Sequence, residues 1–84
     1  DALVDSPEEA ENLRIRSQLM RALTRTVKGW DLPQKDAAAR LRVTQPRLND
    51  LLKGKIDKFS LDALVNLLGA ADLALEISVI PRAA

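Results

Sequence analysis

The stretch QKDAAARLRVTQPRLNDLLK, residues 34–53, decides the fold of this chain. Its first half is crowded with alanine, the best helix former, whose small side chain lets a second helix approach closely. Thr44 followed by Pro46 is typical of a helix start, and Gly54 after the stretch is typical of a helix end. The second half carries apolar residues at helical spacing: Leu48, Leu51 and Leu52. The stretch therefore predicts two short helices joined by a tight turn at residues 42–43.

Two further helices are expected on either side of this stretch. Ser6 caps the first, which is predicted over residues 7–28, with Gly29 ending it. Ser60 caps the last, which is predicted over residues 61–71. Their apolar residues recur at helical spacing and should share one core: Ile15, Leu19, Met20, Leu23, Val27, Leu61, Leu64, Leu67 and Leu68. The prediction is a mainly α domain of four to five helices.

The period changes near the end of the chain. Residues 73–80 show an alternating pattern, which predicts a β-strand that Pro81 ends. No other strong strand pattern is present, so the N–H and C=O groups of this strand need a partner. We expect antiparallel pairing with the same strand of a second copy, while residues 2–4 remain a shorter alternative within the chain. The residues expected at the dimer contact are Leu73, Leu75, Ile77 and Val79.

The composition excludes several classes of protein. The chain has 84 residues, enough for one small domain, and contains neither cysteine nor histidine. It therefore has no disulfide, no thiolate or imidazole metal site and no histidine base, and we expect no enzyme, no metal and no cofactor. No apolar run approaches the ~20 residues of a membrane span, so a cytoplasmic protein is expected. No feature indicates a small-molecule ligand.

The charges divide the chain into three parts. Residues 1–12 sum to −5, residues 13–58 to +8 and residues 59–84 to −2. We interpret the basic middle either as ordinary solvated helix faces or as a surface for phosphates. Together with the helical pattern, this predicts an acidic N-terminal segment and helix start over residues 1–12. A main domain over residues 13–72 and a C-terminal strand and tail over 73–84 follow it.

The spacing within residues 34–53 resembles that of a known family. Counting from the first of them, small or apolar residues stand at the fifth, eighth, tenth, fifteenth and eighteenth positions: Ala38, Leu41, Val43, Leu48 and Leu51. LPQ leads into the stretch, LLKGK spans its end and FSLDALVNLL follows it. Over residues 13–80 these features resemble the lambda-repressor-like (XRE) helix-turn-helix regulators, among them HigA-like antitoxins. Arg42 and Asp72 depart from the pattern where glycine is common, and Pro33 where a Ser or Thr cap is common.

The resemblance implies that the second helix of the stretch enters the major groove of double-stranded DNA. Its outward side chains are then expected to contact base edges: Gln45, Pro46, Arg47, Asn49 and Asp50. For Asp50, an ion pair with Lys53 is an equal alternative. Residues of the first helix, the turn and the exit of the second helix are expected to contact phosphates: Gln34, Arg42, Thr44, Lys53, Lys55 and Lys58.

Two functions are therefore considered. The first is a transcriptional regulator, acting as a repressor, that binds an inverted repeat in DNA as a homodimer. The second is an antitoxin-type interaction module whose acidic first segment docks on a basic toxin, with or without repression of its own promoter. The two are compatible. The expected partners are double-stranded DNA and a second copy, with a toxin protein as a further candidate and no membrane.

Overall fold

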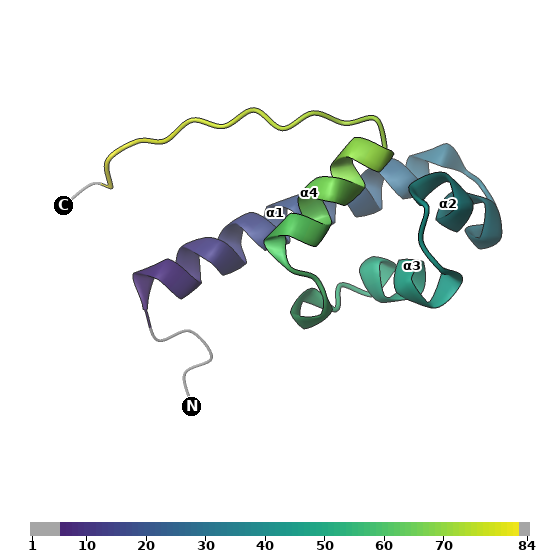
Figure 1. Cartoon of the computed structure of the whole chain (residues 1–84), viewed down its shortest axis with the longest axis horizontal. Helices are drawn as coiled ribbons and strands as arrows, with labels where there is room; N and C mark the ends of the chain where they lie inside the picture. The colour runs from purple at the N-terminus through teal and green to yellow at the C-terminus, as the bar shows by residue number, and fades with distance from the viewer. Residues whose placement is uncertain (1–5, 83–84) are drawn as a thin grey trace.

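The computed structural model describes residues 6–82, which contain four α-helices and a short 3₁₀ helix. They are α1 (Pro7–Trp30), α2 (Gln34–Leu41), α3 (Gln45–Leu52), η1 (Ile56–Lys58) and α4 (Leu61–Ala70). α4 packs along α1, and α2 packs against α3 (Figure 1). The prediction of a mainly α domain with four to five helices is thus confirmed. No helix within these residues has the length and apolar character that a membrane crossing needs.

α1 begins where the sequence predicts but ends later. The Ser6 hydroxyl accepts a hydrogen bond from the Glu9 N–H at 3.1 Å. The predicted end at Gly29 is wrong, because this glycine remains helical and Asp31 takes the left-handed conformation instead, at φ 54° and ψ 41°. Aspartate tolerates this conformation better than most residues. The extra length also keeps Trp30 in the helix and packed against the core.

The turn between α2 and α3 lies where the sequence predicts it. Arg42 adopts the left-handed conformation at φ 61°, and the next N–H, of Val43, donates to the Ala38 carbonyl at 3.0 Å. An arginine in this conformation costs on the order of 1 kcal/mol relative to glycine. Pro33 precedes α2 without a side-chain cap, as the departure from the family pattern predicts. Ala38 is 2% exposed, and its small side chain allows α3 to pack closely against α2.

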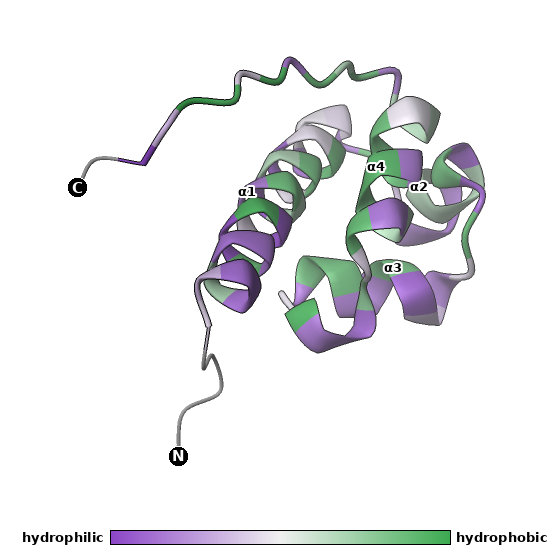
Figure 2. Ribbon diagram, turned by 60° about the vertical axis from the view of Figure 1, so that its left-hand side comes forward, coloured by the Kyte–Doolittle hydropathy of each residue, from purple (hydrophilic) through white to green (hydrophobic). Residues whose placement is uncertain are grey.

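One hydrophobic core joins all four helices. Its most deeply buried members come from each helix and from the segment before α4: Leu23, Leu41, Leu48, Leu51, Phe59 and Leu64. Burial of this apolar surface is the main stabilising contribution for so small a domain. Trp30 lies at the edge of the core, where the Arg40 guanidinium stacks 4.1 Å from its ring centre. Figure 2 shows that the first turns of α1 are mostly hydrophilic.

The C-terminal segment differs from its prediction. Residues 73–80 contain no β-strand, and none occurs anywhere between residues 6 and 82. A strand is defined by hydrogen bonds to a neighbouring strand, and in this single chain the segment runs apart from any such neighbour (Figure 1). The alternative partner, residues 2–4, lies outside the described residues. Leu73 packs against the core, whereas the other predicted contact residues are exposed by 42%, 75% and 91%: Leu75, Ile77 and Val79.

Candidate nucleic-acid interface

The outer face of α3 is the centre of the candidate interface. Leu48 and Leu51 point into the core at 0% and 1% exposure, which turns the opposite side of the helix outward. Thr44 fixes the helix start, because its hydroxyl accepts a hydrogen bond from the Arg47 N–H at 3.2 Å. The side chains away from the core are exposed or half-buried: Gln45, Pro46, Asn49 and Lys53. Their amide, ring and ammonium groups can contact base edges and phosphates.

Arg47 is held by the segment that joins η1 to α4. Its guanidinium donates a hydrogen bond to the Lys58 carbonyl at 2.8 Å and lies 4.0 Å from the centre of the Phe59 ring. The ring is 1% exposed, so the guanidinium covers part of the core. This packing role is one that the sequence pattern did not reveal. The base contact expected of Arg47 stays a prediction, and it would compete with these two contacts for the guanidinium.

Asp50 connects α3 to the loop that follows it. Its carboxylate oxygens lie 3.5 Å from the Lys55 Nζ and 3.6 Å from the Lys58 Nζ. The alternative pair with Lys53 is not among the ion pairs of residues 6–82. Two of the predicted phosphate contacts thus share a carboxylate neighbour. All three side chains keep contact with solvent, so each pair contributes no more than about 1 kcal/mol.

Arg16 of α1 contacts η1 and the segment that follows it, on the side that faces α1. Its guanidinium donates to the Ile56 carbonyl at 3.1 Å and to the Phe59 carbonyl at 3.5 Å, and its Nε donates to the Asn12 side chain at 2.6 Å. The sequence prediction missed this residue. The available signal was its position one helical turn before Met20, which places it on the buried side of α1. Arg16 therefore positions the loop that carries the candidate lysines.

The remaining predicted phosphate contacts border α3. Arg42 precedes its start and is exposed, while the three lysines follow its end: Lys53, Lys55 and Lys58. Gln34 is exposed in the first turn of α2 and shares a hollow of about 230 Å³ with Leu48 and Leu52, so it lies beside α3. Thr44 uses its hydroxyl oxygen in the helix cap. The structure thus brings the predicted residues to one region around α3, with Arg47 and Asp50 engaged inside the protein.

The shifted pKa values lie outside this interface, at the start of α1. The Arg14 guanidinium donates a hydrogen bond to the Glu11 carboxylate at 3.1 Å, which lowers the pKa of Glu11 and raises that of Arg14. The charge of Arg82 also lowers the pKa of Glu11, so the end of the C-terminal segment influences α1. Among the described residues, no group of acidic side chains is arranged to hold a metal ion.

Comparisons with known proteins agree with this geometry. A family model described as a helix-turn-helix domain matches residues 2–80. A solved structure described as "Putative XRE Family Transcriptional Regulator" is 35% identical in sequence, and the match covers 90% of this chain and 90% of that chain with a TM-score of 0.80. No curated protein matches the chain. Both likenesses extend over most of the chain rather than over α2 and α3 alone.

Proposed function

We propose, from the premise that this chain belongs to the helix-turn-helix domain family and is similar to an XRE-family regulator, that it represses transcription by binding an inverted repeat as a homodimer. Membership of the family makes the chain a DNA-binding domain. The inverted repeat, the homodimer and the repression are our proposal. The observation that supports it best is the outward face of α3, where hydrogen-bonding side chains lie opposite the buried leucines and lysines follow.

The proposed base contacts come from the first two turns of α3. Gln45 and Asn49 each carry an amide that can form two hydrogen bonds with an adenine. Pro46 can pack against a thymine methyl group. For Arg47 and Asp50, contacts with a guanine and a cytosine amine would compete with their partners within the protein. We therefore assign the main discrimination to the two amides.

The proposed phosphate contacts surround α3. They are Gln34, Arg42, Thr44, Lys53, Lys55 and Lys58. These side chains and helix starts would fix the register of α3 in the groove without selecting a sequence. Each neutralised phosphate releases condensed counterions, so the logarithm of the affinity should fall with the logarithm of salt concentration by about 0.9 per cationic contact.

The proposed homodimer forms through residues 73–80. Three of the apolar side chains of this segment are largely exposed, and its backbone has no neighbouring strand within residues 6–82. Antiparallel pairing of two such segments would satisfy their backbone groups and bury these side chains together. The two copies of α3 would then meet half-sites about 34 Å apart, one turn of the DNA helix.

Selection of binding sites from random DNA tests this function. We expect enrichment of an inverted repeat whose half-sites are one helical turn apart. The matched control is Gln45→Ala with Asn49→Ala, which should keep the fold and salt-dependent binding but lose the enrichment. No enrichment by the unchanged protein at low salt would contradict the proposal. Enrichment of single half-sites alone would contradict only the dimer.

An antitoxin role is a second, compatible proposal. The observation that favours it is the start of α1, where Glu8 and Glu9 are exposed and acidic. The first turns of the helix are mostly hydrophilic (Figure 2). Such a surface suits a basic partner protein. The test is co-purification of a small basic protein encoded beside the gene. Binding of that protein should fall sharply in Glu8→Lys with Glu9→Lys, and unchanged binding would exclude this surface.

A further inference from the structure

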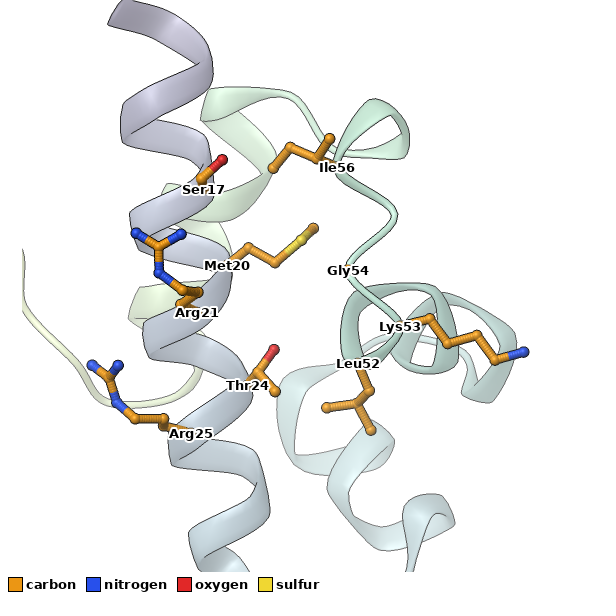
Figure 3. A pocket seen from close by; sticks show the side chains of 9 residues that line it. All are labelled: Ser17, Met20, Arg21, Thr24, Arg25, Leu52, Lys53, Gly54 and Ile56. Carbon is orange, nitrogen blue, oxygen red and sulfur yellow. The ribbon is translucent and has the colours of Figure 1, made fainter.

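A cavity whose apolar lining the proposed function does not use lies between α1 and the loop that joins α3 to η1. Its volume is about 500 Å³, within the ~300–1,000 Å³ of ordinary small-molecule sites. Figure 3 shows that Ser17 and Thr24 point from α1 toward the loop and that Ile56 points back toward α1. Apolar lining comes from Met20, Leu52 and Ile56, and the two hydroxyls add hydrogen-bonding groups.

Cationic side chains border this cavity without an acidic neighbour. Arg21 and Arg25 lie on α1 and Lys53 follows α3, and no Asp or Glu of the described residues lines the cavity. Within residues 6–82, none of the three side chains has an ion pair or a hydrogen bond. Four arginines elsewhere are engaged with a carboxylate, carbonyls or a ring: Arg14, Arg16, Arg40 and Arg47. In Figure 3 the Arg21 and Arg25 side chains extend away from the loop, so pairing with an anion in the cavity requires these exposed side chains to turn toward it.

We infer that this cavity binds a small organic anion with an aliphatic or aromatic body, and that the bound anion lowers the affinity for DNA. The body lies against Met20, Leu52 and Ile56, and its carboxylate, sulfonate or phosphate group pairs with Arg21 or Arg25. A DNA backbone would satisfy the cations but has nothing to place against the apolar lining. The regulatory half of this inference rests on the proposed function, whereas the binding half does not.

The cavity is coupled to the candidate interface through α3. Leu52 is the last residue of this helix and Lys53 caps it, and both line the cavity opposite α1. The Lys53 side chain points away from α1 (Figure 3) and is one of the proposed phosphate contacts. An anion held in the cavity adds negative charge to a site that Lys53 also lines, and this charge repels the phosphate that Lys53 is proposed to bind, which weakens DNA binding. Because such coupling is reciprocal, DNA must weaken binding of the anion by the same factor.

Binding of the fluorescent probe anilinonaphthalene sulfonate to the full chain, without DNA, tests the cavity itself. We expect the affinity to fall by about tenfold or more in Arg21→Gln with Arg25→Gln, because charge-assisted contacts are lost. Thr24→Phe, which keeps every charge but fills the cavity, should have a similar effect. The matched control, Lys28→Gln with Lys35→Gln, removes the same charge elsewhere and should bind as the unchanged protein does.

Two results would overturn the binding half. One is equal affinity in all these variants. The other is loss of probe binding only in Ile77→Ser with Val79→Ser, which would assign the probe to the exposed C-terminal segment. Thermal denaturation of each variant separates misfolding from loss of the site, and the arginine variant remains informative if Thr24→Phe is unstable, since both arginines are exposed.

Competition on the selected DNA site tests the regulatory half. Saturating probe should raise the dissociation constant for DNA, and DNA should raise that of the probe by the same factor. Loss of DNA affinity in the arginine variant without probe present would identify Arg21 and Arg25 as phosphate contacts and overturn the regulatory half. Failure of DNA binding by the unchanged protein would contradict the proposed function, while the probe titration would still decide whether the cavity is a site.

Discussion

The α2–α3 unit and the C-terminal segment, residues 73–80, differ in where their apolar side chains find partners. Leu48 and Leu51 of α3 are 0% and 1% exposed, whereas Ile77 and Val79 are 75% and 91% exposed. The backbone of a helix forms its hydrogen bonds within the same element, but an extended segment needs a neighbouring strand. The comparison teaches that two short helices can satisfy their backbone hydrogen bonds and bury their apolar side chains within one small chain. An apolar extended segment needs a neighbouring strand to do the same.

The largest expected effect concerns the buried side of this comparison. Leu48→Ala should lower the free energy of unfolding by ~2–5 kcal/mol, because it leaves a cavity in the core. Val79→Ala, measured at a protein concentration where the chain is monomeric, should change it by less than ~0.5 kcal/mol. Urea denaturation followed by circular dichroism measures both. Similar losses for the two variants would show that the C-terminal segment is also packed within one chain.

The next effect concerns the exposed apolar side chains of the C-terminal segment. Ile77→Asp with Val79→Asp should raise the dissociation constant of the proposed homodimer by about 100-fold or more, because charged groups would enter an apolar contact. Analytical ultracentrifugation measures this constant. Glu76→Gln is the control, since it changes a neighbouring exposed residue without adding charge to the apolar row. If the double variant associates as strongly as the unchanged protein, the dimer contact lies elsewhere.

Arg47→Ala tests whether the contacts that this α3 side chain makes within the protein stabilise the fold. The change removes the hydrogen bond to the Lys58 carbonyl and the contact with the Phe59 ring, so it should lower the free energy of unfolding by about 1–2 kcal/mol. If Arg47 also contacts a guanine, selection of binding sites should show relaxed preference at one position. Arg40→Ala, which loses a similar ring contact, is the control. An equal loss of affinity on the selected site and on random DNA would remove Arg47 from the base contacts.

Asp50→Asn should have a smaller effect of opposite sign on DNA binding. Without the carboxylate, Lys55 and Lys58 are free to pair with phosphates, so affinity for all sequences should rise by about two- to fivefold and its salt dependence should steepen. Fluorescence anisotropy over a range of salt concentrations measures this. Asp57→Asn removes the same charge from η1 and is the control. A changed preference at a single base pair would instead assign Asp50 to a cytosine.

The smallest effect concerns the approach of the C-terminal segment to α1. The pKa of Glu11 is lowered from 4.5, mainly by the hydrogen bond from Arg14 and further by the charge of Arg82. The resulting stabilisation is present above the unfolded pKa and is lost as the pH falls through the lower folded value. In carboxyl titrations by NMR, Arg14→Gln should raise the pKa of Glu11 more than Arg82→Gln does. No change in Arg82→Gln would contradict the proximity of the segment.

Helix starts and core positions could be predicted from the sequence because each depends on local spacing. Ser6, Thr44 and Ser60 each accept a hydrogen bond from the N–H three residues further on. The helix-turn-helix prediction and the expectation that the chain is not an enzyme are confirmed by its family. The end of α1 was predicted wrongly because Gly29 and Asp31 both suit the left-handed position, and only packing of the folded chain decides between them.

The contacts of the charged side chains could not be predicted from spacing. Arg16 reaches the Ile56 carbonyl across 40 positions in the sequence, and Arg47 reaches the Lys58 carbonyl across 11. A sequence pattern marks both only as polar residues on a helix. For the same reason the individual base and phosphate contacts remain predictions, because they depend on how each side chain is shared between the protein and DNA.

Three chain reversals after helices use left-handed residues that are not glycine: Asp31, Arg42 and Asp72, at φ 54°, 61° and 63°. Each of these residues lowers the free energy of unfolding by as much as about 1 kcal/mol relative to glycine at the same position. For a small domain whose free energy of unfolding is on the order of 5 kcal/mol, this keeps the protein close to the lowest stability at which it remains mostly folded. Binding to DNA as proposed would add stability by mass action, so we expect the free protein to unfold, and to be degraded, more readily than the bound protein. Cellular lifetime would thus follow operator occupancy, and copies in excess of their sites would be removed first.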